Sequence, residues 1–205
     1  PAIALFHAVC FALDWMLFPS LRRQEIRTPV FVIGHARSGT TLLHRLLSED
    51  RERFSCFLLW ELYFPSLLQK KAIRWLGRLD ARRLGGALAR RVEEWDRRKF
   101  AATNDMHAMS LFKPEEDDSV LTYSCASGWW IVRLPYMEKL DFYYVDEWPE
   151  ARRRRLLRFY KECVRRQLAL DGGDRVHLSK NPTYCGRVES LIEAFPDARS
   201  VVTMR

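Results

Sequence analysis

The fold of this chain is decided by Pro29-Val30-Phe31-Val32-Ile33-Gly34-His35-Ala36-Arg37-Ser38-Gly39-Thr40-Thr41-Leu42-Leu43. The stretch begins with β-branched and aromatic residues that a glycine ends, which is typical of a short buried strand. The paired leucines that follow Thr41 have the spacing of a helix. Gly34 and Gly39 lie between the two elements. A strand, a glycine loop and a helix in this order form a cradle whose backbone N–H groups bind phosphate.

The glycine loop differs from the nucleotide-binding P-loop at one position. The spacing of its glycines fits the pattern G-x-x-x-x-G-K-[ST], but Thr40 occupies the place of the lysine. That lysine normally reaches the β- and γ-phosphates of a nucleoside triphosphate. The strong cation of this loop is Arg37, which precedes the second glycine. An early arginine without the lysine suits a shorter anion that binds without a metal ion.

The rest of the chain alternates between strands and helices. Residues 175–179 and 200–204 are predicted to be two further strands, and residues 186–195 between them a helix. This alternation implies parallel pairing in a P-loop-like, three-layer α/β/α fold. Residues from about 55 to 170 have a mostly helical pattern, which predicts a long helical insert. We expect this insert to build the pocket for a second, acceptor molecule beside the bound anion.

Three features subdivide the predicted insert. Gly85-Gly86 interrupts its first helical pattern. Residues 101–118 are predicted to form a loop. A helix over residues 149–170 follows, with apolar side chains on one face, and the glycines of residues 171–174 end it.

Two stretches resemble the sulfotransferases that use 3′-phosphoadenosine 5′-phosphosulfate. Residues 29–43 look like the 5′-phosphosulfate loop of that family, in the Arg-Ser-Gly-Thr-Thr form of its bacterial-type branch. Residues 179–205 are similar to the family's strand, helix and strand that lead to the 3′-phosphate site. Trp60-Glu61 and residues 114–117 also look like stretches of this branch. The two main matches occur in the family's order along the chain.

The resemblance implies 3′-phosphoadenosine 5′-phosphosulfate as co-substrate, and no metal. The residues it assigns to the donor are Arg37, Ser38, Gly39, Thr40, Thr41, Leu42 and Arg205. Arg37 and the loop amides would neutralise charge on the leaving phosphate, and Arg205 would hold the 3′-phosphate. Lys180 directly follows the second predicted strand, at the edge where α/β sheets place ligands. We expect it to donate to the transferring sulfuryl group.

The proton acceptor has several candidates. Glu61 lies in an apolar, aromatic stretch, where burial would suit it to proton transfer; a buried glutamate paired with an arginine is the alternative. His107 lies in the predicted loop and titrates near neutral pH. The branch often has a histidine shortly after the lysine-proline stretch, but here Tyr184 occupies that place. Glu115 and Glu116 follow a proline and would cap a helix.

The composition describes a basic globular protein. The chain has 205 residues, of which 29% are charged, and a formal net charge of +8. This charge suits anionic ligands, but no aromatic and basic platform for RNA is present, so we expect no nucleic-acid partner. Five scattered cysteines without C-x-x-C spacing argue against a zinc site and a disulfide framework. We expect a cytoplasmic location, with membrane association as the alternative.

The chain is predicted to have an amino-terminal apolar helix and linker over residues 1–28 and a sulfotransferase domain over residues 29–205. The apolar run over residues 2–18 is too short to cross a membrane and lacks the features of a secretory signal. It would pack on the domain or lie on a membrane surface near a lipid substrate, and both alternatives stay open. Because the chain stops at Arg205 directly after an apolar run, we expect the domain to be incomplete at its carboxy terminus.

The sequence therefore predicts an enzyme that moves a sulfuryl group to a hydroxyl or amine of a small-molecule, lipid or glycan acceptor. Its oligomeric state is not readable. One alternative is a P-loop kinase or NTPase, which would require a lysine at position 40 and a Walker-B aspartate. Another is a non-enzymatic domain that binds anions or membranes, which would leave the strand, loop and helix without a role.

Overall fold

A parallel sheet forms the centre of the protein. The computed structural model describes residues 2–35, 37–101, 109–124, 126–128, 130 and 143–204. The strands are β1 (Val30–Ile33), β2 (Phe54–Ser55), β3 (Val176–Lys180) and β4 (Arg199–Val202), and they lie in the order β2-β3-β1-β4. In the centre of the sheet, Val32 pairs with Lys180 on one side and with Val201 on the other. All carboxyl ends therefore meet at one edge.

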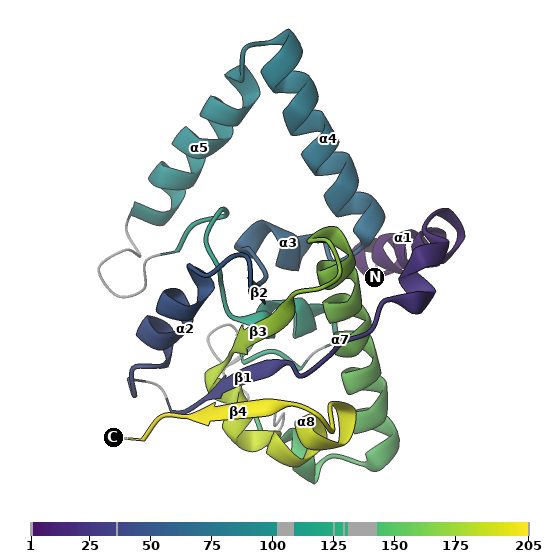
Figure 1. Ribbon diagram of the computed structural model, residues 1–205, viewed down its shortest axis with the longest axis vertical. Helices are drawn as coiled ribbons and strands as arrows, with labels where there is room; N and C mark the ends of the chain where they lie inside the picture. The colour runs from purple at the N-terminus through teal and green to yellow at the C-terminus, as the bar shows by residue number, and fades with distance from the viewer. Residues whose placement is uncertain are drawn as a thin grey trace.

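Three helices pack on this sheet (Figure 1): α2 (Thr40–Ser48), α7 (Glu150–Leu170) and α8 (Val188–Ala194). The parallel sheet with its flanking helices confirms the predicted α/β class. The main core lies between β1 and the pair α7 and α8. There the ring of Phe31 of β1 packs at a tilt of 54° against that of Phe195, with 5.3 Å between the ring centroids.

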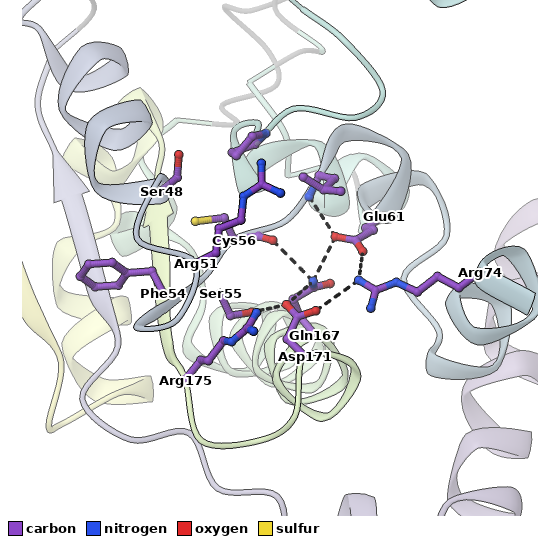
Figure 2. A pocket seen from close by; sticks show the side chains of 12 residues that line it. Ser48, Arg51, Phe54, Ser55, Cys56, Glu61, Arg74, Gln167, Asp171 and Arg175 are labelled. Carbon is purple, nitrogen blue, oxygen red and sulfur yellow. Dashed lines mark hydrogen bonds and ion pairs between the residues drawn. The ribbon is translucent and has the colours of Figure 1, made fainter. Parts of the chain in front are cut away.

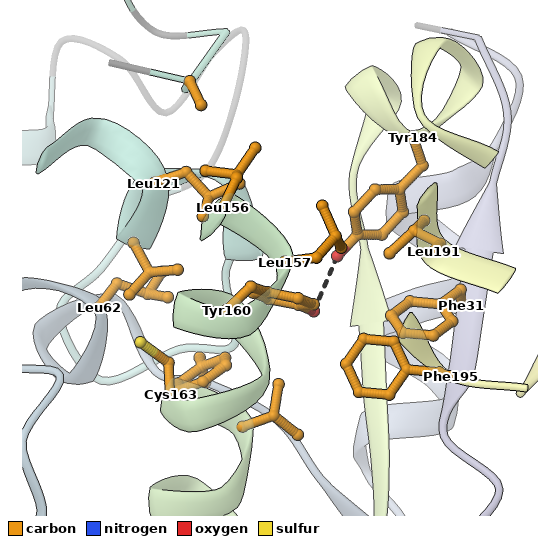
Figure 3. Close-up of a cluster of buried hydrophobic side chains, with 14 of the residues drawn as sticks. Phe31, Leu62, Leu121, Leu156, Leu157, Tyr160, Cys163, Tyr184, Leu191 and Phe195 are labelled. Carbon is orange, nitrogen blue, oxygen red and sulfur yellow. Dashed lines mark hydrogen bonds between the residues drawn. The ribbon is translucent and has the colours of Figure 1, made fainter. Parts of the chain in front are cut away.

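Two tyrosine hydroxyls meet inside this core (Figure 3). Tyr160 of α7 and Tyr184 exchange a hydrogen bond of 2.9 Å. Tyr160 also donates to Asp117 at 2.6 Å and lies 3.2 Å from the hydroxyl of Ser179 in β3. Burial raises the pKa of both tyrosines well above their usual value. Tyr184 is thus a neutral core residue that fixes α7 against β3.

The insert between β2 and β3 contains most of the remaining helices. They are α3 (Leu59–Tyr63), α4 (Leu67–Arg83), α5 (Ala87–Phe100) and the 3₁₀ helices η3 (Asp117–Ser124) and η4 (Val145–Glu147). The break predicted at Gly85-Gly86 is confirmed, because both glycines have positive φ and separate α4 from α5. Helix α7 also belongs to the insert in sequence, but it packs in the core of the sheet.

The amino-terminal helix α1 (Ala2–Leu17) packs on the domain, followed by the 3₁₀ helix η1 (Pro19–Arg23). Its fully buried Asp14 accepts from the backbone N–H groups of Leu67 and Leu68 at the start of α4. The same carboxylate pairs with the buried Arg166 of α7 at 2.7 Å. The opposite side of α1 is apolar and exposed. Within the described residues, no helix is both long and apolar enough to span a membrane.

Two details of the sheet region differ from the sequence-based predictions. The sequence predicted three strands, whereas a fourth, β2, pairs in parallel with β3. Two residues are too few to produce a recognisable period. The helix predicted over residues 186–195 is the shorter α8, and the 3₁₀ helix η5 (Pro182–Gly186) precedes it. Arg187, with a φ of −149°, lies between the two elements.

Candidate functional site

The loop between β1 and α2 has the geometry of an anion cradle. Gly39 has a φ of +88° and Arg37 a φ of +70°, so the chain turns twice through the left-handed region. Helix α2 begins at Thr40 without a side-chain cap. Its first backbone N–H groups therefore remain available at the positive end of the helix dipole. Arg37 is exposed beside them, and no described carboxylate pairs with it.

The loop closes tightly on the end of β4. Ser38 Oγ lies 2.8 Å from Thr203 Oγ1, and the Thr203 backbone N–H donates to the Ile33 carbonyl at 2.9 Å. A Cβ atom at Gly34 would come within 2.2 Å of Thr203 Oγ1, so only glycine fits there. The two stretches that resemble the donor site are thus in contact. Arg205, predicted to hold the 3′-phosphate, lies outside the described residues.

The other predicted donor residues lie on α2. Thr40 is buried and Thr41 is half-buried, whereas the Leu42 side chain is 65% exposed. Because its side chain points to solvent, we expect Leu42 to contact the donor through its backbone N–H or through the exposed surface of its side chain. These residues occupy the first turn of the helix, where unpaired N–H groups gather.

Lys180 ends β3 at the same edge of the sheet. Its side chain is buried, and its ammonium group donates to the carboxylate of Glu116. Glu116 is half-buried, with 19% of its side chain exposed. The sequence places Glu116 in a stretch similar to the family and predicts a helix cap there, but it does not predict the pair with Lys180. The signal that could have found this pair is the run of four acidic residues after Pro114, which needs buried partners.

The last two residues of that acidic run fix the strand and turn around Lys180. Asp117 accepts a hydrogen bond from Nε2 of His177 at 3.0 Å, beneath β3. Asp118 accepts from Asn181 and from Thr183, each at 3.0 Å. Two carboxylates therefore hold the residues on both sides of Lys180, which orients its side chain.

His44 of α2 lies near this cluster but is not charged at neutral pH. Burial lowers its pKa to about 4, an effect that Asp117 and Glu115 oppose and that Lys180 and His177 reinforce. Its Nε2 is buried without a hydrogen-bond partner in the described part of the chain. The ring therefore acts as a neutral packing group beneath the loop between β1 and α2.

Glu61 occupies a separate polar cluster at the outer edge of β2 (Figure 2). Its Oε1 accepts from Arg74 at 3.0 Å, and its Oε2 accepts from the Leu58 N–H and from Gln167 Nε2, each at 3.0 Å. Asp171 joins the same cluster through Arg74 and Gln167. Glu61 is fully buried, and the cavity that it lines has a volume of about 230 Å³. The contacts are those of a glutamate paired with an arginine.

His107 lies outside the described residues, so its role stays a prediction. The described residues also contain no group of three or more His, Cys, Asp or Glu side chains placed to hold a metal ion. The site that emerges consists of a loop and helix start with Arg37 and, at the same carboxyl edge of the sheet, the buried Lys180 and the half-buried Glu116.

Comparison with known proteins concerns the family and the fold of the chain. A model of the sulfotransferase family matches residues 29–205. The omega-hydroxy-beta-dihydromenaquinone-9 sulfotransferases Stf3 of Mycobacterium bovis and Mycobacterium tuberculosis are each 28% identical over 194 residues. That alignment covers 86% of this chain and 42% of each relative. The chain thus spans less than half the length of these relatives.

Two solved structures have a similar fold. The sulfotransferase STF1 of Mycobacterium tuberculosis is 22% identical, with a TM-score of 0.63 over 99% of this chain and 52% of that one. STF9 of Mycobacterium avium is 19% identical, with a TM-score of 0.66 over 96% of this chain and 47% of that one. At this identity the similarity concerns the fold, which includes the sheet and the helices that flank it.

Proposed function

Because this chain belongs to the sulfotransferase family, we propose that it transfers a sulfuryl group from 3′-phosphoadenosine 5′-phosphosulfate to a hydroxyl or amine acceptor. The observation that carries the proposal is the meeting of three features at one edge of the sheet. These are the uncapped start of α2, the end of β4 and Lys180. The start of α2 would bind an anion, the end of β4 leads toward Arg205, and Lys180 supplies a buried cation.

The donor fits the loop on physical grounds. The 5′-phosphosulfate would accept hydrogen bonds from the backbone N–H groups of Gly39, Thr40 and Thr41, with Arg37 as the charged partner. The absence of a Cβ at Gly34 allows the loop to close against Thr203. Without a lysine at position 40, the loop has no group that would reach the third phosphate of a triphosphate.

The reaction requires charge neutralisation at one oxygen and proton removal at another. The acceptor oxygen or nitrogen forms a bond to sulfur, while the bond from sulfur to the bridging phosphate oxygen breaks. Negative charge then develops on the leaving phosphate, where the loop amides and Arg37 would stabilise it. Lys180 would donate to the sulfuryl oxygens or to the bridging oxygen from the opposite side.

The acceptor must also lose a proton, and we propose Glu116 as the group that takes it. Glu116 is half-buried and already contacts Lys180, so a base and a cation lie side by side. When the sulfuryl group draws Lys180 toward itself, the ion pair between Lys180 and Glu116 weakens, and the carboxylate becomes a better proton acceptor. Both oxygens of Glu61 are engaged by other groups, which favours a role in shaping the pocket. Glu61 and His107 remain competing predictions.

The names of the relatives bear on the class of acceptor. The curated relatives are named for a hydroxylated menaquinone, so a hydroxyl on a lipid is the acceptor that we favour. An amine or a glycan hydroxyl would require the same donor site and the same proton transfer.

Calorimetry tests the donor assignment directly. We expect 3′-phosphoadenosine 5′-phosphate to bind in the presence of a chelator, and Arg37→Ala to weaken that binding by about tenfold to a hundredfold. Arg22→Ala, which removes an exposed arginine far from the loop, is the matched control and should bind as the wild type does. Tighter binding of magnesium-ATP than of the adenosine bisphosphate would instead support a P-loop kinase or NTPase.

A further inference from the structure

The helices α4 and α5 form a hairpin that projects from the body of the protein (Figure 1). Between Trp75 and Lys99, the only buried residues are Asp80 and Asp96. The hairpin is therefore almost entirely outside the core, although it carries tryptophan and leucine side chains. Nothing in the proposed reaction uses these side chains.

The two buried aspartates show that the hairpin is a defined structure. The carboxylate of Asp80 accepts from the backbone N–H groups of Leu88 and Ala89 at 3.1 and 3.0 Å, which caps the start of α5. Asp96 accepts from the Leu111 N–H at 2.8 Å and from the Ser110 hydroxyl at 2.7 Å. Polar contacts thus fix the tip and the base of the hairpin, and leave its apolar side chains without a core.

Those apolar side chains form one stripe on each helix. On α4 the stripe consists of Trp75, Leu76 and Leu79, and on α5 of Leu88, Val92 and Trp95. Leu79 follows Trp75 by four residues and Leu76 by three, and Val92 lies four residues after Leu88 and three before Trp95, so each set lies on a single helix face. Trp75 is 55% exposed and Trp95 is 52% exposed. Two exposed tryptophans on neighbouring helices indicate a surface that binds something apolar.

The hairpin is also strongly basic. Residues 67–100 contain eleven Lys or Arg and four Asp or Glu. Lys70 is buried and Arg74 pairs with Glu61 and Asp171, so nine exposed basic residues remain on the hairpin. A basic helix with tryptophan and leucine on its apolar face is typical of segments that lie in a membrane interface. Arginines close to anionic lipid headgroups add an electrostatic attraction to the apolar burial.

We propose that the α4–α5 hairpin docks the protein on an anionic lipid surface. The tryptophans and leucines would enter the boundary between headgroups and acyl chains, while the arginines contact lipid phosphates. Charge selects this occupant over a second copy of the chain, because two hairpins in contact would bring two strongly positive surfaces together. Membrane binding by the hairpin does not depend on the identity of the acceptor.

Vesicle sedimentation of the chain tests the proposal. We expect binding to vesicles of phosphatidylcholine and phosphatidylglycerol, and binding at least about tenfold weaker to phosphatidylcholine alone or in high salt. The double variant Trp75→Ser and Trp95→Ser should lose at least about tenfold in affinity for the anionic vesicles. Its matched control, Leu5→Ser and Met16→Ser, changes two exposed apolar residues of α1 and should bind as the wild type does.

A charge-reversed pair provides a second test that leaves the apolar stripes unchanged. Arg82→Glu with Arg83→Glu at the hairpin tip should weaken binding about tenfold or more, whereas Arg22→Glu with Arg23→Glu in η1 gives the same net charge and should have little effect. The proposal is overturned if the α1 or η1 controls lose as much binding as the hairpin variants. It is equally overturned if the wild type does not bind anionic vesicles, or if the hairpin variants abolish only self-association.

Discussion

Ser38 Oγ and Thr203 Oγ1 lie 2.8 Å apart, although 165 residues separate them in the chain. This contact joins the phosphate loop to the end of β4, and therefore joins the two stretches that the family resemblance assigns to opposite ends of the donor. The order β3-β1-β4 in the sheet makes the contact, because β1 and β4 are neighbours and end at the same edge.

Removal of the Ser38–Thr203 contact should weaken donor binding without unfolding the chain. We expect Thr203→Val to reduce the affinity for 3′-phosphoadenosine 5′-phosphate about fivefold, since a neutral hydrogen bond contributes about 1 kcal/mol. Calorimetry of Ser38→Ala, Thr203→Val and the double variant gives the coupling between them. If the two single effects add fully in the double variant, the contact does not organise the loop.

Gly34→Ala should destabilise the protein, because the added methyl group would meet Thr203 Oγ1 at 2.2 Å and Ser38 Oγ at 2.7 Å. We expect a loss of about 1–3 kcal/mol in the free energy of unfolding, measured by urea denaturation. Gly77→Ala in α4 is the control, since a Cβ there meets nothing within 4 Å. That change should raise stability by roughly 0.5–1 kcal/mol. Equal effects at both positions would contradict the close packing of the loop.

Glu116→Gln should lower kcat far more than it alters donor affinity. If the carboxylate accepts the proton of the acceptor, we expect kcat to fall about a hundredfold to a thousandfold, while the dissociation constant of the bisphosphate changes little. Glu94→Gln, an exposed glutamate of α5, is the matched control. Retained turnover in Glu116→Gln together with loss in Glu61→Gln or His107→Ala would assign the proton transfer elsewhere.

His44 should make the stability of the protein depend on pH in the mildly acidic range. Its pKa is about 4 in the folded protein and 6.5 in the unfolded chain, so the unfolded state binds the proton more tightly. The contribution of neutral His44 is fully present above pH 6.5 and is lost as the pH falls toward 4, by up to about 3 kcal/mol. Urea denaturation of His44→Gln at pH 7 and pH 4.5 should show a smaller difference than the wild type shows.

The family and the α/β class could be read from the sequence because their signals are local. The strand, loop and helix around Gly39 all lie between Val30 and Ser48, and the glycine break between α4 and α5 needs only its own φ angles. The prediction of strands over residues 175–179 and 200–204 was confirmed for the same reason. The short β2 was missed, since its two residues become a strand only by pairing with β3.

The partners of charged side chains required the tertiary structure. The sequence alone predicted a phosphate cradle with Arg37, and placed Lys180 at the end of a strand. Only the packed chain decided that Lys180 meets Glu116, 64 residues away, and that Glu61 is held by Arg74 and Gln167. Loops and helices bring such groups together over separations that no sequence period encodes. Burial then determines each partner, because a charge removed from water must be paired or hydrogen-bonded.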